Sequence, residues 1–320
     1  MQQREFGKLG FISALTLGGG GIGQVWGETN RAEAIRTVHK AVDNGINFLD
    51  VAPSYGQGEA ERVIGDAFGG VLPEGVRIST KHHLGEVPPG EVALHLQTSL
   101  EESLERLQLE KVNLFFLHGM VIPDNYKGVQ RGTPRSQFIQ EVRPAFEKLV
   151  RTGRIDGWGI SGIGVPSALV ETLEENPRPN AIQCITNLLD SAGSMHTYNE
   201  SMEPRKLIGL ANKVGTGVMG IRAVQAGALT DELDREVPHD HPEMIDYKRA
   251  SGFRHLAAEF GVSAASLAHR YALSMDGVST VVLGVKNCEE LEECLQAEKS
   301  GPLTKDEITL IDQCVGSKHS

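Results

Sequence analysis

Short apolar runs alternate with segments of helical periodicity along almost the whole chain. The apolar runs predict eight strands, at Leu15–Gly18, Ile46–Ala52, Val76–Lys81, Val112–His118, Asp156–Ser161, Ala181–Thr186, Gly217–Val224 and Thr280–Val285. The periodic segments predict a helix after each strand, at Arg31–Asn44, Glu59–Phe68, Gly90–Leu107, Gln137–Arg151, Pro166–Glu174, Pro204–Val214, Tyr247–Ser274 (with a break near Gly261) and Asn287–Glu298. This alternation is typical of parallel βα units.

Eight βα repeats in 320 residues favour a closed (β/α)8 barrel, the TIM barrel, over an open doubly wound sheet. Barrels of this length commonly form one unit, and no segment resembles a linker, so residues 1–320 are predicted to be a single domain. The longest irregular stretches, Gly119–Ser136 and Gln225–Asp246, directly follow strands. Loops at that end of the strands carry the active sites of barrel enzymes.

Composition and charge narrow the range of partners. The chain has 42 acidic and 31 basic residues, a net charge of −11, and the acidic residues are spread over predicted helices. We therefore expect no nucleic-acid partner and no anionic membrane partner. The four cysteines form no disulfide framework, which indicates reduced thiols in a cytoplasmic protein. No signal-peptide pattern and no membrane-length apolar run occurs in the sequence, and nothing in it indicates an oligomeric state.

A glycine-rich segment near the N-terminus, TLGGGGIGQVWG, fits the G-x-G-x-x-G spacing of a Rossmann dinucleotide site at Gly18, Gly20 and Gly23. That motif requires a helix that opens at its last glycine. Here the helical period begins only near Ala32, and in so dense a glycine run some triplet fits by chance. We reject the Rossmann interpretation.

Four ionisable residues lie at or just after the ends of three successive predicted strands. Asp50, Lys81 and His118 lie at strand ends, and Tyr55 follows the second strand. Each has a structural alternative: an ion pair for Asp50 and Lys81, a core position for His118, and a loop aromatic for Tyr55. Because parallel strand ends meet at one mouth of a barrel, their joint occurrence favours a functional group.

Ordered motifs make the chain resemble the aldo-keto reductases. FGKLGFISALTLG resembles the N-terminal β-hairpin and first strand of that family, and NFLDVAPSYGQGEAERVIGDAF resembles its most diagnostic segment. The segments ISTK, VNLFFLH, WGISG, AIQCITNLL, GVMGIRAVQAGALT and VLGVKNCEELEECLQA follow in family order. The resemblance runs from about Phe6 to Ala297. A single segment would be weak evidence for the family, whereas the whole set in this order is specific to it.

The resemblance implies an NAD(P)H-dependent oxidoreductase that interconverts an aldehyde or ketone and its alcohol. Its catalytic group would be Asp50, Tyr55, Lys81 and His118, with Tyr55 donating a proton while the nicotinamide delivers hydride. Lowering a tyrosine pKa from about 10 to near 7 requires roughly 4 kcal/mol. A lysine ammonium at ~4 Å with an effective dielectric near 20 supplies about that much. Asp50 partly offsets this field, so Lys81 alone should fall short, and His118 would orient the carbonyl.

The resemblance also implies a dinucleotide site, with NADP(H) favoured and NAD(H) possible. Ser161 and Gln183 match the pair that holds the carboxamide, and Lys286 resembles the contact to the 2′-phosphate, which Glu290 would repel. Lys286 precedes a helix whose free N–H groups form an anion site. The expected cofactor residues are Gly18, Gly19, Gly20, Asp50, Ser161, Gly162, Gln183, Ile221, Arg222, Lys286, Asn287, Glu290, Glu293 and Cys294.

Besides Glu290, which stands where the family often has an arginine or a neutral residue, four of these positions depart from the family pattern. Gly162 and Cys294 replace asparagines, and Ile221 replaces an aromatic residue that stacks on the nicotinamide. Arg222 replaces a small polar residue. Its side chain either reaches a cofactor phosphate or an acidic substrate, or it pairs with a surface carboxylate.

Two other classes of function stay open. A non-catalytic dinucleotide-binding barrel, acting as a redox sensor or scaffold, is disfavoured because it needs no acid. A metal-dependent hydrolase is disfavoured because His82 and His83 face opposite sides of a strand, and His239 and His241 have no evident third ligand. We expect no catalytic metal. Only the segment TKDEITLIDQCV follows as a further short helix, which predicts an open site for a small carbonyl or alcohol substrate, with modest specificity.

Overall fold

Eight parallel strands close into a barrel in the computed structural model, which describes residues 1–25, 27, 29–85, 87–129 and 132–315. The strands are β3 (Leu15–Gly18), β4 (Phe48–Asp50), β5 (Arg77–His82), β6 (Val112–Leu117), β9 (Ile155–Ser161), β10 (Ala181–Ile185), β11 (Gly217–Ile221) and β12 (Thr280–Leu283). They pair in chain order around the ring, and β12 pairs with β3 to close it. The (β/α)8 barrel predicted from the sequence is confirmed.

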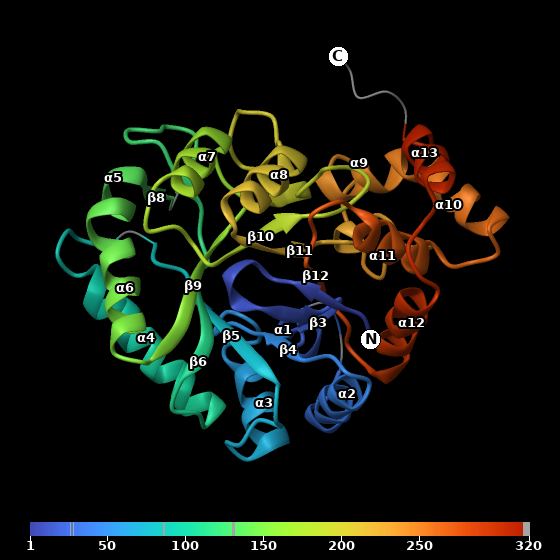
Figure 1. The fold of residues 1–320 in the computed structure, drawn as a ribbon. Helices are drawn as coiled ribbons and strands as arrows, with labels where there is room; N and C mark the ends of the chain where they lie inside the picture. The colour runs from blue at the N-terminus through green and yellow to red at the C-terminus, as the bar shows by residue number, and fades with distance from the viewer. Residues whose placement is uncertain (26, 28, 86, 130–131, 316–320) are drawn as a thin grey trace.

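Helices surround the strands on the outside of the barrel (Figure 1). They include α2 (Arg31–Asp43), α3 (Glu59–Phe68), α4 (Val92–Leu107), α7 (Pro166–Glu174), α8 (Pro204–Val214), α12 (Cys288–Lys299) and α13 (Lys305–Gln313). The Asn30 side chain caps α2 and the Asn287 side chain caps α12, while Gly69 and Gly215 end α3 and α8 in the left-handed region. No helix in the described part of the chain is long and apolar enough to cross a membrane.

The helix predicted at Gln137–Arg151 is interrupted in the structure. It begins as α5 (Arg135–Gln137), continues through a π-helical turn at Phe138–Val142, and ends as α6 (Arg143–Arg151). Its apolar residues still face the core, with Phe138 and Phe146 fully buried. Hydrophobic periodicity therefore located the helix but could not show the extra residue in its π-helical turn.

The helical segment predicted at Tyr247–Ser274 does break near Gly261, as expected, but it also has a second break and begins earlier, so it forms three helices. They are α9 (Pro242–Arg249), α10 (Ser251–Glu259) and α11 (Ala264–Ser274). Pro242 occupies the first turn of α9, where its fixed φ and missing N–H suit a helix start. The break at Ala250 is followed directly by Ser251 and Gly252, a dipeptide common in turns, but it was not predicted.

Some short elements were not predicted. One helical turn, α1 (Gly19–Ile22), follows β3, and two short strands, β7 (Val121–Ile122) and β8 (Thr133–Pro134), pair within the loop after β6. Residues 130 and 131 of that loop lie outside the described residues.

An N-terminal β-hairpin closes one end of the barrel. Its strands, β1 (Gln3–Glu5) and β2 (Phe11–Ser13), pair antiparallel, and Phe6 between them is fully buried. Phe6 packs in a cluster with Phe48, the first residue of β4. A Cβ atom at Gly217, the first residue of β11, would lie 2.3 Å from the Phe6 ring. The hairpin therefore fills the N-terminal end, and a bare glycine makes room for it.

Strand alternation decides which side chains enter the barrel. Phe48 packs with the interior cluster around Phe6, and Asp50, two residues later, also points inward. Leu49 between them packs in the larger core beneath the helices. The interior is consequently apolar near the hairpin and polar toward the C-terminal ends of the strands.

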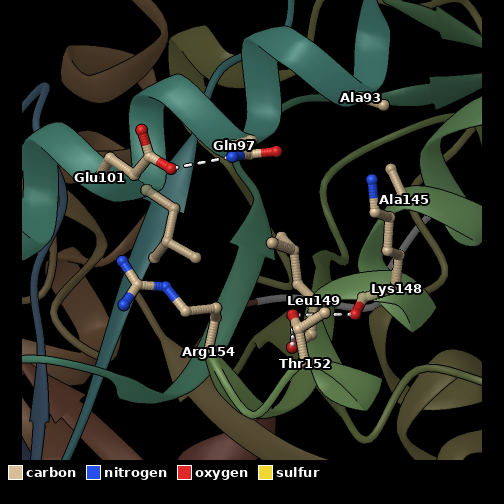
Figure 2. Close-up of a pocket in the computed structure, with 9 residues that line it drawn as sticks. Ala93, Gln97, Glu101, Ala145, Lys148, Leu149, Thr152 and Arg154 are labelled. Atoms are coloured by element: carbon tan, nitrogen blue, oxygen red, sulfur yellow. Dashed lines mark hydrogen bonds between the residues drawn. The ribbon is translucent and has the colours of Figure 1, made fainter.

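A groove of about 300 Å³ lies on the outer surface between α4 and α6 (Figure 2). It is lined by Ala93, Gln97, Leu100, Glu101, Ala145, Lys148, Leu149, Thr152 and Arg154. Gln97 donates a hydrogen bond to Glu101 along α4, at 2.9 Å. The groove arises from helix packing and is separate from the polar interior of the barrel.

We expect Gly217→Ala to lower the free energy of unfolding by about 1–3 kcal/mol, because the new methyl group overlaps the Phe6 ring. The matched control is Gly209→Ala in α8, where an added Cβ would have no neighbour within 4 Å in the part of the chain that the structure describes. That change should stabilise the chain by about 0.5–1 kcal/mol, since it removes a glycine from a helix interior. Urea unfolding followed by circular dichroism measures both. Equal effects of the two substitutions would contradict this account of the hairpin.

Candidate active site

A buried ion pair lies at the polar end of the barrel interior. The Lys81 ammonium donates to Asp50 Oδ2 at 2.8 Å and to the Val51 carbonyl at 2.9 Å. Asp50 Oδ1 accepts from the Ser79 hydroxyl at 2.5 Å, and Oδ2 also accepts from Gln183 Nε2 at 2.9 Å. Lys81 is 0% exposed and Asp50 is 2% exposed. Such a pair is tolerated in a protein interior only when further hydrogen bonds satisfy both groups, as they do here.

Tyr55 is brought to this pair by a tight turn after β4. The Lys81 ammonium lies 4.8 Å from the centroid of the Tyr55 ring. Gly56, at φ 64°, lets the turn approach the glycine-rich segment, since a Cβ there would lie 2.1 Å from the Gly23 carbonyl oxygen. A Cβ at Gly19 would lie 3.0 Å from the Tyr55 ring. The glycine run therefore allows close packing against the tyrosine turn.

The charge states of Tyr55 and Lys81 follow from burial and from each other. Burial raises the pKa of Tyr55, the Lys81 charge acts against this, and the Asp50 charge adds to it. Burial disfavours the charged form of Lys81, but Asp50 and Tyr55 outweigh it and raise the pKa of Lys81. Lys81 is thus an ammonium and Tyr55 a neutral phenol. The effect of Lys81 on Tyr55 has the direction expected from the sequence, while burial reverses the net shift.

His118 packs against Tyr55 directly after β6. The two rings meet edge to face, with centroids 5.7 Å apart. Burial, together with the Lys81 charge, lowers the pKa of His118 to about 3. Its Nδ1 lies 3.4 Å from the Ser54 hydroxyl. The imidazole is therefore neutral near pH 7 and has one donor and one acceptor nitrogen.

The other histidines do not gather into a metal centre. Burial lowers the pKa of His82 to about 4, and its buried Nε2 has no hydrogen-bond partner among the described residues. His241 Nδ1 lies 2.6 Å from a carboxylate oxygen of Glu243. Over the described ranges, no three His, Cys, Asp or Glu side chains are placed to hold a metal ion together.

Several residues expected to contact a cofactor lie beside the ion pair. Gln183 must direct Nε2 at Asp50 because an ionised carboxylate only accepts hydrogen bonds, which leaves Oε1 as an acceptor. The Gly162 N–H donates to the Gln183 carbonyl at 2.8 Å, and the Ser161 hydroxyl accepts from the Ile163 N–H at 3.3 Å. A Cβ at Gly18 would lie 2.3 Å from the Leu283 carbonyl oxygen.

Lys286 is paired with two carboxylates. Its ammonium lies 3.1 Å from Glu290 Oε1 and 3.1 Å from Asp234 Oδ2. Glu290 also accepts from the Lys286 N–H at 2.8 Å, and the Asn287 side chain accepts from the Glu290 N–H. Glu290 was anticipated from helix spacing. Asp234 was missed, because it lies in the loop after β11 and no motif marks it.

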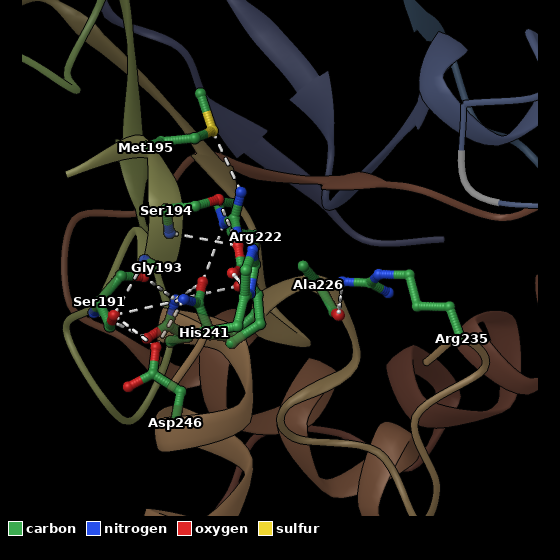
Figure 3. Close-up of polar contacts among 12 residues, drawn as sticks. Ser191, Gly193, Ser194, Met195, Arg222, Ala226, Arg235, His241 and Asp246 are labelled. Carbon is green, nitrogen blue, oxygen red and sulfur yellow. Dashed lines mark hydrogen bonds and ion pairs between the residues drawn. The ribbon is translucent and has the colours of Figure 1, made fainter. Parts of the chain in front are cut away.

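Arg222 forms a buried ion pair beside the loop after β11 (Figure 3). Its Nη2 lies 3.2 Å from Glu243 Oε1, and its Nε donates to Gln225 Oε1 at 2.9 Å. Arg222, Gln225 and Ala226 have φ of 57°, 47° and 50°, which is unusual for residues with a Cβ. Of the alternatives expected for Arg222, the structure shows pairing with a carboxylate, but with a buried one and not a surface one.

Two other residues expected to contact the cofactor, Cys294 and Glu293, make their polar contacts with α11 and its N-cap. Cys294 Sγ lies 3.7 Å from His269 Nε2, and burial raises the pKa of this thiol. Glu293 accepts a hydrogen bond from the Ser263 hydroxyl. Neither contact links them to Asp50 or Lys81. The four cysteines are free thiols.

We expect Lys81→Met to lower the free energy of unfolding by about 3 kcal/mol, because Asp50 would keep a buried charge without its cation. The double variant Asp50→Asn/Lys81→Met should lose less than Lys81→Met alone, since no charge is then left unpaired. Denaturant unfolding at neutral pH measures both. Additive losses would contradict the coupling of the two side chains.

Comparisons with known proteins agree with this fold. A family model described as "Aldo/keto reductase family" matches residues 14–316. L-Galactose dehydrogenase of Arabidopsis thaliana is 26% identical, over 93% of this chain and 88% of its own length. L-Glyceraldehyde 3-phosphate reductase of Escherichia coli K12 is 28% identical, over 98% of this chain and 92% of its own length.

Solved structures show the same architecture. The holo form of an aldo-keto reductase from Bacillus halodurans superposes with a TM-score of 0.74 at 24% identity, covering 98% of this chain and 96% of its own. A glycerol dehydrogenase from Gluconobacter oxydans gives a TM-score of 0.72 at 23% identity, covering 98% of this chain and 94% of its own. At these identities the superpositions establish the fold, while the family model spans most of the sequence. The chain belongs to the aldo/keto reductase family and is an NAD(P)-dependent oxidoreductase.

Proposed function

We propose that this chain interconverts an aldehyde or ketone and its alcohol, with Tyr55 as the general acid and base. The observation that supports this most directly is the buried Lys81 ammonium, held by Asp50 at 2.8 Å and lying 4.8 Å from the Tyr55 ring. A fixed cation beside a phenol stabilises the phenolate that remains after proton transfer. A barrel that only binds a dinucleotide has no need of this arrangement.

The proton follows a short route in this proposal. In reduction, the Tyr55 hydroxyl gives its proton to the carbonyl oxygen, and the Lys81 ammonium stabilises the phenolate. Because burial raises the pKa of Tyr55, the hydroxyl is protonated and ready to donate at neutral pH. The neutral His118 imidazole donates a hydrogen bond that orients the carbonyl. A bound nicotinamide cofactor supplies or accepts the hydride.

Residues around the ion pair fit the nicotinamide end of such a cofactor. Gln183 Oε1 is left as an acceptor by the bond from Nε2 to Asp50, and an acceptor suits the amino group of a carboxamide. Ser161 lies beside Gln183, where β9 pairs with β10. We assign these two residues to the carboxamide, and the glycines from 18 to 20 to the adjacent ribose.

Lys286 is the residue proposed to distinguish NADP(H) from NAD(H). A 2′-phosphate would have to compete with Asp234 and Glu290 for its ammonium, since each lies 3.1 Å away. These carboxylates weaken the preference for NADP(H) expected from the sequence. We therefore infer use of both cofactors.

Apolar side chains at the C-terminal ends of the strands and in the loops that follow them favour a substrate with an apolar part. Ile163 and Ile185 are buried there, and Met120, Met202 and Ile221 pack partly exposed against them. We infer a small carbonyl compound whose unreactive portion contacts these side chains.

The segment between β10 and α8, which was not expected to contribute, also lies beside these side chains. The Tyr126 hydroxyl, in the loop after β6, donates to the Glu200 carboxylate and accepts from the Asn199 N–H. The segment around residue 200 therefore contacts the loop after β6. It would shape the site together with the loops expected to do so, Gly119–Ser136 and Gln225–Asp246.

We expect Tyr55→Phe to lower turnover of glyceraldehyde or para-nitrobenzaldehyde by about 10²–10⁴-fold, because the proton donor is lost. Cofactor affinity should stay within about twofold, since the ring remains. Tyr247→Phe is the matched control, because its hydroxyl bonds the Asp231 carbonyl outside this site. Steady-state rates and fluorescence titration measure these quantities. Near-normal turnover by Tyr55→Phe would remove Tyr55 from the mechanism.

Fluorescence titration with NADPH and with NADH tests the cofactor assignment. We expect both to bind, and Lys286→Met to weaken NADPH about tenfold while leaving NADH nearly unchanged, because only NADPH carries the 2′-phosphate. Failure of both to bind the unmodified chain would contradict the proposed function. An equal effect of Lys286→Met on both cofactors would remove Lys286 from the phosphate site.

A further inference from the structure

Ser79 contributes a third hydrogen bond to the Asp50 carboxylate. It lies two residues before Lys81 on β5, points to the same side of the strand, and is 0% exposed. Its hydroxyl must donate, because the ionised carboxylate can only accept, and the Oγ–Oδ1 distance is 2.5 Å. Asp50 is its side-chain partner, and its backbone carbonyl accepts from the Val51 N–H at 3.0 Å.

The two carboxylate oxygens of Asp50 have different partners. Oδ2 accepts from Lys81 and Gln183, which lie on β5 and β10, while Oδ1 accepts from Ser79. A short hydrogen bond to a charged acceptor in a dry interior is strong and directional. The Ser79 bond therefore fixes the rotation of the carboxylate, so that Oδ2 stays directed at Lys81.

The Asp50 charge has two opposing consequences. It keeps Lys81 protonated and in place, yet it disfavours ionisation of Tyr55. A hydroxyl donor on Oδ1 turns the positive end of its dipole toward the carboxylate. This stabilises the negative charge at Oδ1 and reduces the field of the carboxylate at Tyr55.

We propose that Ser79 is a positioning residue for the proton transfer, fixing the Asp50 carboxylate so that Lys81 holds its place beside Tyr55 and the phenolate is easier to form. This inference rests on the proposed function for its catalytic meaning. The titratable groups that face Tyr55 are Lys81, Asp50 and His118, and His118 is neutral above a pH of about 3. Ser79 acts on Tyr55 only through Asp50 and Lys81.

The test measures ionisation of Tyr55 directly. The ultraviolet absorbance of tyrosinate is followed as the pH rises, and the same titration of Tyr55→Phe is subtracted to remove the other tyrosines. We expect Ser79→Ala to move the Tyr55 midpoint upward by about 0.5 pH unit, a roughly threefold change in the ionisation constant. Ser79→Cys, which keeps a weak donor, should move it in the same direction by less.

A matched control removes another buried hydroxyl from the barrel. Thr280 on β12 bonds Thr16 at 2.8 Å and does not touch Asp50, so Thr280→Val should leave the Tyr55 midpoint unchanged. In turnover assays with para-nitrobenzaldehyde, the alkaline limb of kcat should shift with the Ser79→Ala midpoint. The fluorescence Kd for NADPH and NADH should stay within about twofold.

An unchanged Tyr55 midpoint in Ser79→Ala overturns the proposal, as does an equal shift in Thr280→Val. The absorbance titration does not depend on turnover. It therefore tests the effect of Ser79 on Tyr55 separately from the role of Tyr55 in catalysis. If Tyr55→Phe retains turnover while Ser79→Ala shifts the midpoint, the proposed role of Tyr55 as general acid and base fails and the linkage of Ser79 to Tyr55 stands. If Tyr55→Phe is inactive and the midpoint does not move, only the role of Ser79 fails.

Discussion

The buried ion pair of Asp50 and Lys81 is the interaction on which the polar interior of this barrel depends. Two opposite charges in a dry interior are stable only when each is fully bonded. Strands β4, β5 and β10 supply the bonds, so the closed barrel is what allows the pair to exist. In turn, the pair fixes the Gln183 amide and places a cation beside Tyr55.

The fold was readable from the sequence because the barrel strands are buried on both faces and so read as short apolar runs, while the helices repeat with their own period. The Asn30 and Asn287 side chains cap α2 and α12, close to the points where the sequence predicts these helices to begin. The break at Ala250 and the π-helical turn at Phe138–Val142 were missed, because hydrophobic periodicity locates a helix but does not show a short break or an inserted residue within it.

The candidate site was predictable where strand order alone brings residues together. Asp50, Lys81 and His118 lie at the ends of neighbouring strands, and the barrel places them within reach of Tyr55. Ser79 lies in the ISTK segment but was not singled out there, and Asp234 lies in no motif; the contacts of both became visible only in three dimensions. The net pKa shift of Tyr55 was likewise hidden, since burial is a property of the folded chain.

The hairpin that carries Phe6 determines the end of the barrel from which small molecules reach the polar interior. Because it fills the N-terminal end of the barrel, whatever reaches Asp50 and Lys81 enters from the opposite mouth. A dinucleotide and a small substrate would then share one entrance and one exit. Whichever of the two molecules lies deeper would have to bind first and leave last. The hairpin at the N-terminal end of the barrel would therefore set the order of binding and release at the opposite mouth.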